Sequence, residues 1–392
     1  MSAIADRLAQ PAAAAGHKQA AAPAMPAANL EMRIVSGPEW DQTIAGFDEV
    51  CQEQLYAFAV ARWPNVTQEP MLFLLDGEVV GGSLVMIQPL PLRLSHIAVS
   101  KWGPMHRDGS RADAGAIYAG MVEALVGEYA HRRGLMLSVL PRASLAPSNG
   151  EYAHLIERGF KRGSSLMFPN RYIVNLRLDD AAQRKSLNQK WRYHLNKSEK
   201  AGLSFEHAGP ERVGEFDALY QAMADRKQFP DHSAYDTVPL LMALEPALRP
   251  ELFFVRHEGE LVAGAVIFKA GERAVYLYGA TNDQALPLRA GYFMHWHIIR
   301  WLRDNTAANW YDLGGTDGFQ GLHQFKKGMV GEAGVIEPVP PVANYASKPL
   351  AYLLGNGAFL ARDAYYQLRR IAEGLLSSKA RPNQARGDES AP

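Results

Sequence analysis

Two distant stretches of the sequence repeat one pattern of apolar runs around a tight turn. Residues 72–86 read LFLLDGEVVGGSLVM and residues 254–268 read FVRHEGELVAGAVIF, which aligns Gly77 with Gly259. An Asp-Gly or Glu-Gly pair between two apolar runs is typical of a β-hairpin. The sequence therefore predicts two hairpins of the same design in one chain.

The elements around each hairpin correspond as well. The first hairpin has a helical stretch before it and a strand, a helix and a strand after it, at residues 39–62, 92–99, 116–131 and 135–140. The second hairpin has the same neighbours in the same order, at residues 210–227, 274–279, 292–304 and 310–313. This shared order predicts an α+β fold, with mixed sheets flanked by helices, in which one module is used twice.

Changes in composition along the chain divide it into five segments. We expect a disordered Ala/Pro-rich leader at 1–30, a first module at 31–168 and a second module at 169–347. An amphipathic helical extension at 348–378 and a disordered tail at 379–392 complete the chain. No apolar run reaches the length needed to span a bilayer.

Overall composition limits the partners and the compartment. Of the 392 residues, 47% are hydrophobic and 21% are charged, and the formal net charge is zero. A neutral chain does not attract polyanions as a whole, so contact with phosphate or nucleic acid requires a local patch. The single cysteine, Cys51, has no internal disulfide partner, which favours a reducing compartment. We therefore expect a cytoplasmic protein.

A glycine-rich loop follows the last predicted strand. The strand ends at Leu313, and glycines at 314, 315, 318 and 321 precede Phe325 and Lys326. Such a number of glycines suggests that the backbone approaches a ligand closely. A lysine delivered by a loop at a strand end is suited to negative charge, although a surface turn with solvated lysines is the alternative.

The segment 181–202 predicts a helix with an excess of basic side chains. It contains six bases and one acid, and Leu187, Trp191 and Leu195 step toward the core at helical spacing. Unopposed bases repel one another unless an anion compensates them. Four bases are therefore candidate ligands for phosphate or the backbone of tRNA: Lys185, Lys190, Arg192 and Lys197. A solvated helix face is the alternative.

Taken together, these pieces resemble the Fem family of non-ribosomal peptidyltransferases, in which two acetyltransferase-like (GNAT) modules are fused. The segments that carry the resemblance follow the family's order: KWGP at 101–104, KWR at 190–192, NKSEKAG at 196–202, YLYGAT at 276–281, YDLGG at 311–315 and GLHQFK at 321–326. The resemblance covers roughly residues 32–345. No single segment is specific, but their order and spacing are.

The resemblance implies transfer of an amino acid from aminoacyl-tRNA to an amine of a peptidoglycan precursor or a similar cell-envelope acceptor, without a cofactor. Attack of the amine on the ester builds a tetrahedral oxyanion, which a fixed cation stabilises. By this resemblance, Lys326 corresponds to the family's lysine that stabilises the oxyanion. Phe325 matches the aromatic residue that positions the acceptor end of the tRNA, and a role as a core anchor is its alternative.

Other residues are implied as contacts to the acceptor. Arg226 stands where family members carry an arginine that contacts the precursor's phosphates, and a guanidinium suits a diphosphate. A surface ion pair with Asp225 or Asp231 is the alternative for Arg226. Three further residues are expected beside the same cleft: Tyr278, Asp312 and Gly315.

No convincing base for the acceptor amine stands out in the sequence. His106 and Asp108 follow the Gly103-Pro104 break and are the two candidates. The chain also departs from the family pattern, because it lacks the helical-hairpin arm of some members and carries the extension at 348–378. The extension places arginines beside an apolar face, so it either packs on the second module or contacts an anionic membrane.

Motifs of other enzyme classes are absent from the sequence. There is no H-E-x-x-H and no paired CxxC, and His295 and His297 are two apart on a helix, so we expect no metal site. An acyl-CoA-dependent N-acyltransferase is the main alternative, although residues 288–293 supply only one glycine of the expected pyrophosphate loop. A non-catalytic precursor- or RNA-binding protein is the second alternative. The expected partners are aminoacyl-tRNA and a phosphate-bearing cell-envelope precursor, with neither DNA nor metal.

Overall fold

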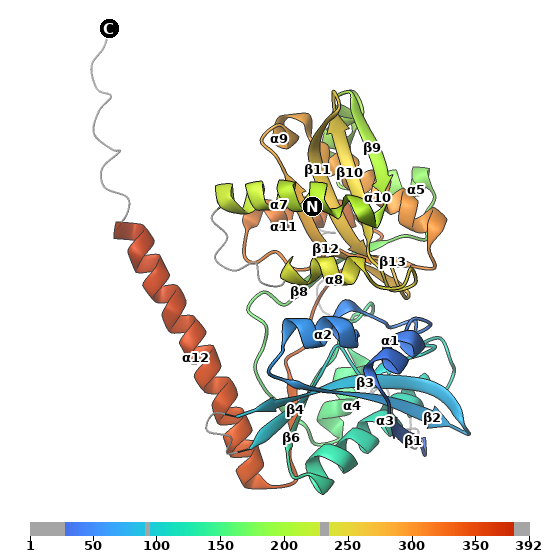
Figure 1. The fold of residues 1–392 in the computed structure, drawn as a ribbon, viewed down its shortest axis with the longest axis vertical. Helices are drawn as coiled ribbons and strands as arrows, with labels where there is room; N and C mark the ends of the chain where they lie inside the picture. The colour runs from blue at the N-terminus through green and yellow to red at the C-terminus, as the bar shows by residue number, and fades with distance from the viewer. Residues whose placement is uncertain (1–27, 91–94, 228–234, 380–392) are drawn as a thin grey trace, which may run out of the picture.

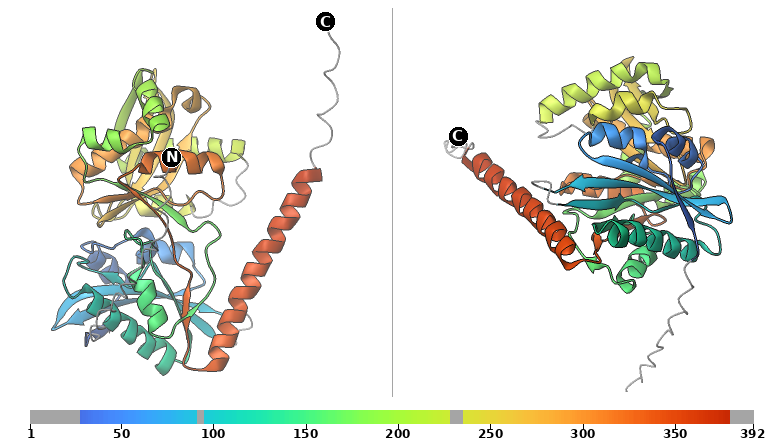
Figure 2. Two further views of the ribbon diagram at one scale, coloured as in Figure 1. Left: turned by 180° about the vertical axis from the view of Figure 1, so that it is seen from behind. Right: turned by 60° about the horizontal axis from the view of Figure 1, so that its bottom comes forward.

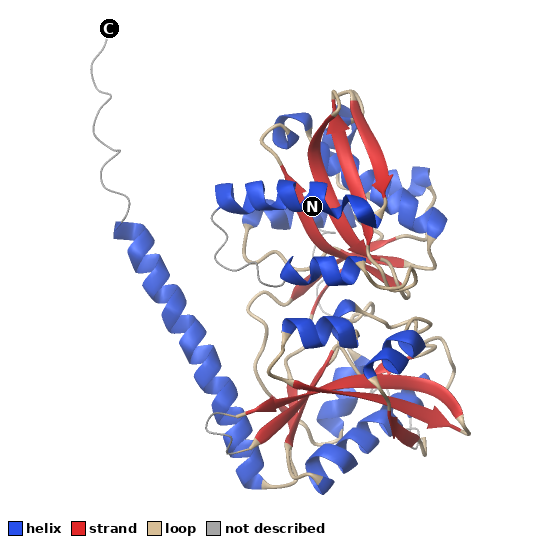
Figure 3. Ribbon diagram, viewed as in Figure 1, coloured by secondary structure: helices blue, strands red, loops and turns tan. Residues whose placement is uncertain are grey.

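The computed structural model describes residues 28–90, 95–227 and 235–379. Most of the predicted leader and tail, and Asp231, lie outside these residues. Two mixed sheets form separate layers, one above the other in Figure 1, and helices cover both faces of each sheet (Figure 3). This arrangement confirms the predicted fold class of two tandem modules.

The first module is built around a sheet with strand order β1-β2-β3-β4-β6-β15-β7, and β5 pairs with β3. Its strands are β1 (Glu31–Ile34), β2 (Thr67–Leu75), β3 (Glu78–Pro89), β4 (His96–Lys101), β5 (Met105–His106), β6 (Met136–Leu140) and β7 (Lys161–Arg162). Its helices are α1 (Gly37–Ile44), α2 (Tyr56–Arg62), α3 (Ala114–Leu125) and α4 (Gly150–Glu157). A 3-10 turn (Gln52–Gln54) precedes α2, and a π-helical segment (Val126–Arg132) extends α3.

The second module is built around a sheet with strand order β14-β8-β13-β12-β11-β10-β9. Its strands are β8 (Asn170–Asn175), β9 (Leu203–Ala208), β10 (Glu251–His257), β11 (Glu260–Phe268), β12 (Arg273–Thr281), β13 (Trp310–Asp312) and β14 (Val335–Pro338). Its helices are α5 (Asp180–Ser186), α6 (Gln189–Ser198), α7 (Val213–Lys227), α8 (Val238–Met242), α9 (Ala285–Leu288), α10 (Ala290–Asn305) and α11 (Gln320–Val330). Short 3-10 turns (Pro210–Arg212 and Tyr235–Thr237) precede α7 and α8.

The two predicted hairpins are β2-β3 and β10-β11, and their turns have the same backbone geometry. Asp76 and Gly77 both have positive φ, at 52° and 83°, and Glu258 and Gly259 repeat this at 50° and 86°. Two successive residues with positive φ match the right-handed twist of the flanking strands, which is why glycine is required at the second position. The hairpin prediction is therefore confirmed in both modules.

Alternation along the strands explains why each sheet has helices on both faces. In β10, Phe253 and Val255 belong to the core beneath α10, whereas Leu252 and Phe254 belong to the core beneath α7. Successive side chains of a strand point to opposite faces, so a nearly continuous apolar run buries both. The strand β2 divides its side chains in the same way between the α3 side and the α1/α2 side.

The chain crosses between the sheets at both ends of the second module. Strand β8 begins directly after the first module and inserts between β14 and β13. Strand β15 (Ala343–Tyr345), which falls inside the segment 169–347, returns to the first sheet and pairs with β6 and β7. The sheets therefore interlock more closely than two consecutive segments would.

One apolar cluster joins the modules. Trp40, Phe47 and Leu55 of the first module share it with Leu241 and Phe268 of the second. The Glu272 N–H also donates to the carbonyl of Asp48 at 2.7 Å. Burial of large side chains from both modules fixes their relative position.

Two predicted helices are broken in the structure. The stretch 39–62 forms α1, the 3-10 turn and α2, and the basic segment 181–202 forms α5 and α6. The second break occurs because Leu187 is extended and Asn188 caps α6 through a hydrogen bond from the Lys190 N–H. The sequence analysis predicted one continuous helix because the segment has good helix formers and no proline, and it did not recognise Asn188 as a helix cap.

The C-terminal extension is a single helix, α12 (Pro349–Lys379), that packs on the first module rather than the second. Phe359 joins a small core with Leu90, Ile97 and Met136. Further along α12, the Asp363 carboxylate accepts a hydrogen bond from the Ser164 hydroxyl. Beyond that contact, α12 stands clear of both modules in every view (Figures 1 and 2). Among the described helices, none has both the length and the apolar composition for crossing a bilayer.

Candidate functional site

A cleft of about 670 Å³ opens where two parallel strands of the second module separate. Strands β12 and β13 pair only at Arg273–Val275 and Trp310–Asp312, after which β12 continues to Thr281 paired with β11 but not with β13. Both modules line the cleft, the first with Glu53, Phe58, Arg62, Trp63 and Lys101, and the second with Arg171, Tyr276, Tyr278, Gly315 and Lys326 among others. Ligands of α/β proteins commonly bind at such strand ends.

Lys326 lies at the separated strand ends, as its position after the glycine-rich loop predicts. It comes from α11 and is 6% exposed. Its Nζ donates to the carbonyls of Leu313 at 2.5 Å and of Gly315 at 2.6 Å. An ammonium has three donors, so one N–H is left for an oxygen in the cleft. Burial, reinforced by the charge of Arg171, lowers the pKa of Lys326 to about 8.

Arg171 and Asp312 form an ion pair between the cleft and the interior. The Arg171 guanidinium lies 3.1 Å from the Asp312 carboxylate, which is 5% exposed and also accepts from the Gly314 N–H. Burial opposes ionisation of Asp312, but Arg171 and Arg273 outweigh it, so the pKa of Asp312 is lowered. Asp312 is therefore a buried anion that orders the start of the loop, and it lies behind the cleft wall.

Tyr278 and Gly315 both line the cleft, as expected. The ring of Tyr278 makes edge contacts with Tyr220 and Tyr235, which hold it against α7. Burial raises the pKa of Tyr278, so its hydroxyl stays protonated at neutral pH. Gly315 contributes its carbonyl to Lys326.

Phe325 is half-buried and packs on the side of α11 that faces α6 and α10. Its ring lies 4.9 Å from Tyr292, 5.6 Å from His295 and 6.1 Å from Trp191. It also lies 3.8 Å from the position that a Cβ on Gly291 would take. In this geometry Phe325 acts as a packing anchor that covers the first turn of α10.

Arg226 is exposed near the end of α7 and does not line the cleft. Its guanidinium donates to the carbonyl of Thr281 at 2.8 Å and pairs with Asp283 at 2.7 Å. The neighbouring Lys227 lines the cleft instead. The ion pair expected as the alternative for Arg226 therefore exists, but with Asp283.

Some basic side chains of α5 and α6 are exposed to solvent, and others are hydrogen-bonded to the protein. Lys185, Lys190 and Lys197 are exposed. Arg192 is half-buried and its guanidinium donates to the Lys185 carbonyl at 2.9 Å, which ties α6 to α5. The segment packs against α10 and α11, the helix that carries Lys326. Three lysines are thus available to an anion beside the site.

Neither candidate base lines the cleft. His106 is buried, its Nδ1 lies 3.1 Å from Glu49, and its Nε2 lies 3.0 Å from the carbonyl of Ala114. Burial would lower the pKa of His106, but the hydrogen bond and charge of Glu49 outweigh it and raise the pKa to about 9. Asp108 is exposed and accepts hydrogen bonds from Ser110. This arrangement does not favour proton abstraction by either residue.

Sequence reasoning did not identify several charged residues of the cleft as site residues, among them Glu53, Lys101 and Arg171. Burial opposes ionisation of Glu53, but Lys101 and Arg171 outweigh it, and the pKa of Glu53 is lowered. Glu53 and Lys101 come from the first module and meet Arg171 only through the module interface. The KWGP segment, which contains Lys101, is the one sequence signal that indicated this side of the cleft.

The chain is similar to known proteins both in sequence and in fold. Residues 182–327 match the family described as Acetyltransferase (GNAT) domain. The crystal structure of FemX superposes with a TM-score of 0.68 at 17% identity, covering 83% of this chain and 100% of FemX. The C-terminal domain of a lysylphosphatidylglycerol synthetase from Agrobacterium fabrum superposes with a TM-score of 0.53 at 13% identity, covering 84% of this chain and 97% of that domain.

A sequence match to a curated protein is shorter. The chain is 32% identical over 77 residues to the Lipid II:glycine glycyltransferase of Staphylococcus aureus, spanning 18% of this chain and 18% of that relative. The GNAT match and the FemX superposition support the GNAT fold, and the superposition and this segment agree with the resemblance to the Fem family that the sequence predicts.

Proposed function

We propose that this chain is an aminoacyltransferase that moves an amino acid from aminoacyl-tRNA to an amine of a peptidoglycan precursor or a similar cell-envelope acceptor. The observation that carries the proposal is the buried Lys326 ammonium at the separated ends of β12 and β13. The name of the staphylococcal relative describes transfer of glycine to lipid II, which supports the same class of reaction here.

The geometry suits stabilisation of an oxyanion. The acceptor amine attacks the ester carbonyl of the donor, the carbonyl oxygen becomes an anion, and the tRNA hydroxyl leaves as the amide forms. Two carbonyls hold the Lys326 Nζ in place, so its remaining N–H needs no reorganisation when this charge develops. Loss of such a donor costs about 10²- to 10³-fold in rate.

The packing of Phe325 favours aminoacyl-tRNA over acyl-CoA as the donor. Acyl-CoA enzymes of this fold seat a pyrophosphate at the first turn of the helix that corresponds to α10, a use of free N–H groups at a helix start. Here the Phe325 ring lies against Tyr292 and Gly291 at that turn. This apolar ring offers a pyrophosphate no hydrogen-bond donor at that turn.

The exposed lysines of α5 and α6 supply a complementary surface for the donor. Lys185, Lys190 and Lys197 project from a segment that packs against α11, and none pairs with a carboxylate of the described residues. Lysines of this kind attract a nucleic-acid backbone. We propose that the tRNA crosses this segment while its acceptor end enters the cleft.

Peripheral membrane contact is a further part of the proposal. The exposed side chains Leu350, Leu353, Leu360 and Leu368 follow α12 and are 60–68% exposed. A lipid-linked acceptor would hold the enzyme at a bilayer, where an apolar helix face inserts shallowly. Sedimentation with anionic vesicles should fall for Leu353→Ser/Leu360→Ser, and unchanged sedimentation would remove α12 from this role.

Donor profiling tests the reaction directly. Charged tRNA and acyl-CoA mixtures are offered in parallel with a muropeptide precursor, and the transferred group is identified by mass. An aminoacyl product from charged tRNA supports the proposal, whereas consumption of acyl-CoA alone supports the acyl-CoA alternative. Binding of tRNA or precursor without any product supports the non-catalytic alternative.

A further inference from the structure

A second polar site lies away from Lys326, in a cavity of about 280 Å³ between the two modules. Four carboxylates and two arginines line it: Asp48, Glu49, Glu151, Glu272, Arg142 and Arg273. The two arginines are held by backbone oxygens, because Arg142 donates to the Glu49 carbonyl and Arg273 to the Ala143 carbonyl, each at 3.0 Å. The excess of carboxylates makes the cavity suited to a cation.

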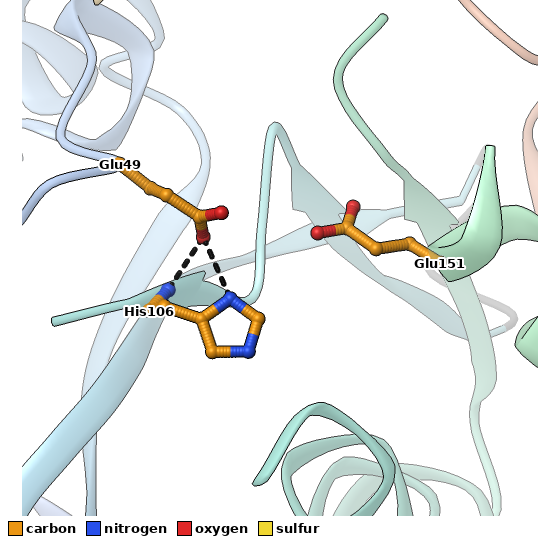
Figure 4. A group of neighbouring side chains, drawn as sticks. All are labelled: Glu49, His106 and Glu151. Atoms are coloured by element: carbon orange, nitrogen blue, oxygen red, sulfur yellow. Dashed lines mark hydrogen bonds and ion pairs between the residues drawn. The ribbon is translucent and has the colours of Figure 1, made fainter. Parts of the chain in front are cut away.

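Three side chains of the cavity and its floor converge, although they are distant in the sequence. Glu49, His106 and Glu151 each present a ligand atom, and these atoms lie within 4.8 Å of one another. Figure 4 shows the Glu151 carboxylate directed toward the Glu49–His106 pair from the opposite side. We propose that these three residues bind one divalent transition-metal ion of the zinc class.

The orientation of His106 is that of a metal ligand. Its Nε2 lies 3.0 Å from the carbonyl of Ala114, which fixes that nitrogen as the N–H donor and leaves Nδ1 facing Glu49. Histidines that bind metals usually donate their other ring N–H to a carbonyl or carboxylate. The ion would take the place of the proton that Nδ1 shares with Glu49.

The spacing of the first two ligand atoms also fits. His106 Nδ1 and Glu49 Oε2 are 3.1 Å apart, close to the separation of about 3.3 Å between tetrahedral ligands at zinc distances. The backbone N–H of His106 donates to the same Glu49 oxygen at 2.6 Å and orients it. This pair therefore provides two adjacent ligands without rearrangement.

Glu151 supplies the third ligand from the first turn of α4. Its carboxylate makes neither a hydrogen bond nor an ion pair with the described residues. Burial and the nearby Glu49 raise the pKa of Glu151, because both disfavour its negative charge. A cation at the cluster would compensate that charge. Three protein ligands leave a coordination position open toward the cavity, where water or an anionic group has room.

Calorimetric titration with zinc and absorption spectroscopy with Co²⁺ test the site on the full chain after treatment with a chelator. The variants are Glu151→Gln and Glu49→Gln, and Glu272→Gln is the matched control because it removes a carboxylate of the same cavity outside the cluster. We expect one ion per chain in the wild type and control. Glu151→Gln should weaken binding more than about 100-fold, since outer-shell groups alone contribute 10- to 100-fold.

Two results would overturn the proposal: no binding by the wild-type chain, or equal affinity in Glu151→Gln and Glu272→Gln. Because the Glu151 carboxylate has no polar partner among the described residues, the variant should unfold at the wild-type temperature in the absence of metal. A zinc-induced rise in that temperature should then appear in the wild type and control alone. The aminoacyl-transfer reaction is not needed for any of these readouts.

Discussion

The two modules share a strand order but end their central parallel pair differently. In the first, β4 and β6 pair over five residues, and the Trp102 N–H then donates to the Leu140 carbonyl at 2.8 Å. In the second, β12 and β13 pair over three residues, and the Leu313 carbonyl accepts from the Lys326 ammonium. In the first module, a backbone hydrogen bond continues the pairing of the two strands. In the second module, the buried Lys326 ammonium binds the carbonyl just after β13, and the strands separate. The duplicated fold thus provides one open strand end, and we place the reaction there.

The residue that faces the same valine position differs in charge between the modules. Val99 pairs with the buried Ser138 in the first module, and Val275 pairs with the buried anion Asp312 in the second. Ser138 donates to the neutral Asn344 side chain at 2.7 Å, whereas Asp312 needs the charged Arg171 as a partner. Charge buried beside an open strand end is a cost that a purely structural module avoids.

The largest expected effect comes from removing the cation. Lys326→Met should lower single-turnover aminoacyl transfer by about 10²- to 10³-fold, because a fixed donor to the oxyanion is lost. Lys327→Met is the matched control, since Lys327 is the exposed next residue on α11. Equal rates in the two variants would show that the open strand end is not the reaction site.

Breaking the buried ion pair tests the second difference. Arg171→Met should destabilise the protein by about 3 kcal/mol in urea unfolding, because it leaves Asp312 buried without its main partner. The double variant Arg171→Met/Asp312→Val removes both charges, as the first module has none at this position, and should recover most of that loss. Arg177→Met, at an exposed position of the same segment, should change stability by less than about 1 kcal/mol. A double variant no more stable than the single one would contradict the pairing argument.

The rate of aminoacyl transfer should depend on pH through the ionisation of Lys326. Its pKa is lowered to about 8, so the ammonium is charged below that pH and neutral above it. The rate should therefore fall tenfold per unit well above pH 8, and Lys326→Met should lack this descending limb. For stability the sign is opposite. The unfolded lysine holds its proton up to a higher pH, so folding gains stability as pH rises above 8. A wild-type profile that stays flat to pH 10 would argue against a charged Lys326 in the reaction.

The smallest expected effect concerns the basic segment, which has no counterpart in the first module. Lys190→Ala/Lys197→Ala should weaken tRNA binding several-fold and reduce the salt slope by about 0.7–0.9 for each phosphate that is no longer neutralised. Lys161→Ala, an exposed lysine of the first module, should leave the slope unchanged. An unchanged slope in the double variant would place the tRNA elsewhere.

The sequence by itself determined the duplicated module, because the turn residues of a hairpin and the period of its apolar runs are local properties. Asp76-Gly77 and Glu258-Gly259 require positive φ whatever surrounds them. The same local reasoning identified Lys326, since a strand end, glycines and a lysine follow one another in the chain. It failed where local propensity competes with a cap, as at Asn188, which splits the basic segment.

Only the tertiary structure decided which distant residues meet. The Phe325 ring packs against Tyr292, and Arg226 pairs with Asp283. Glu53 of the first module lines the same cleft as Arg171 of the second. Glu49 and His106 are 57 residues apart, and a search for spaced metal motifs had no means of joining them to Glu151. Contacts of this kind depend on how two sheets and their helices pack, which is set by the summed burial of many side chains and by no short segment of the chain.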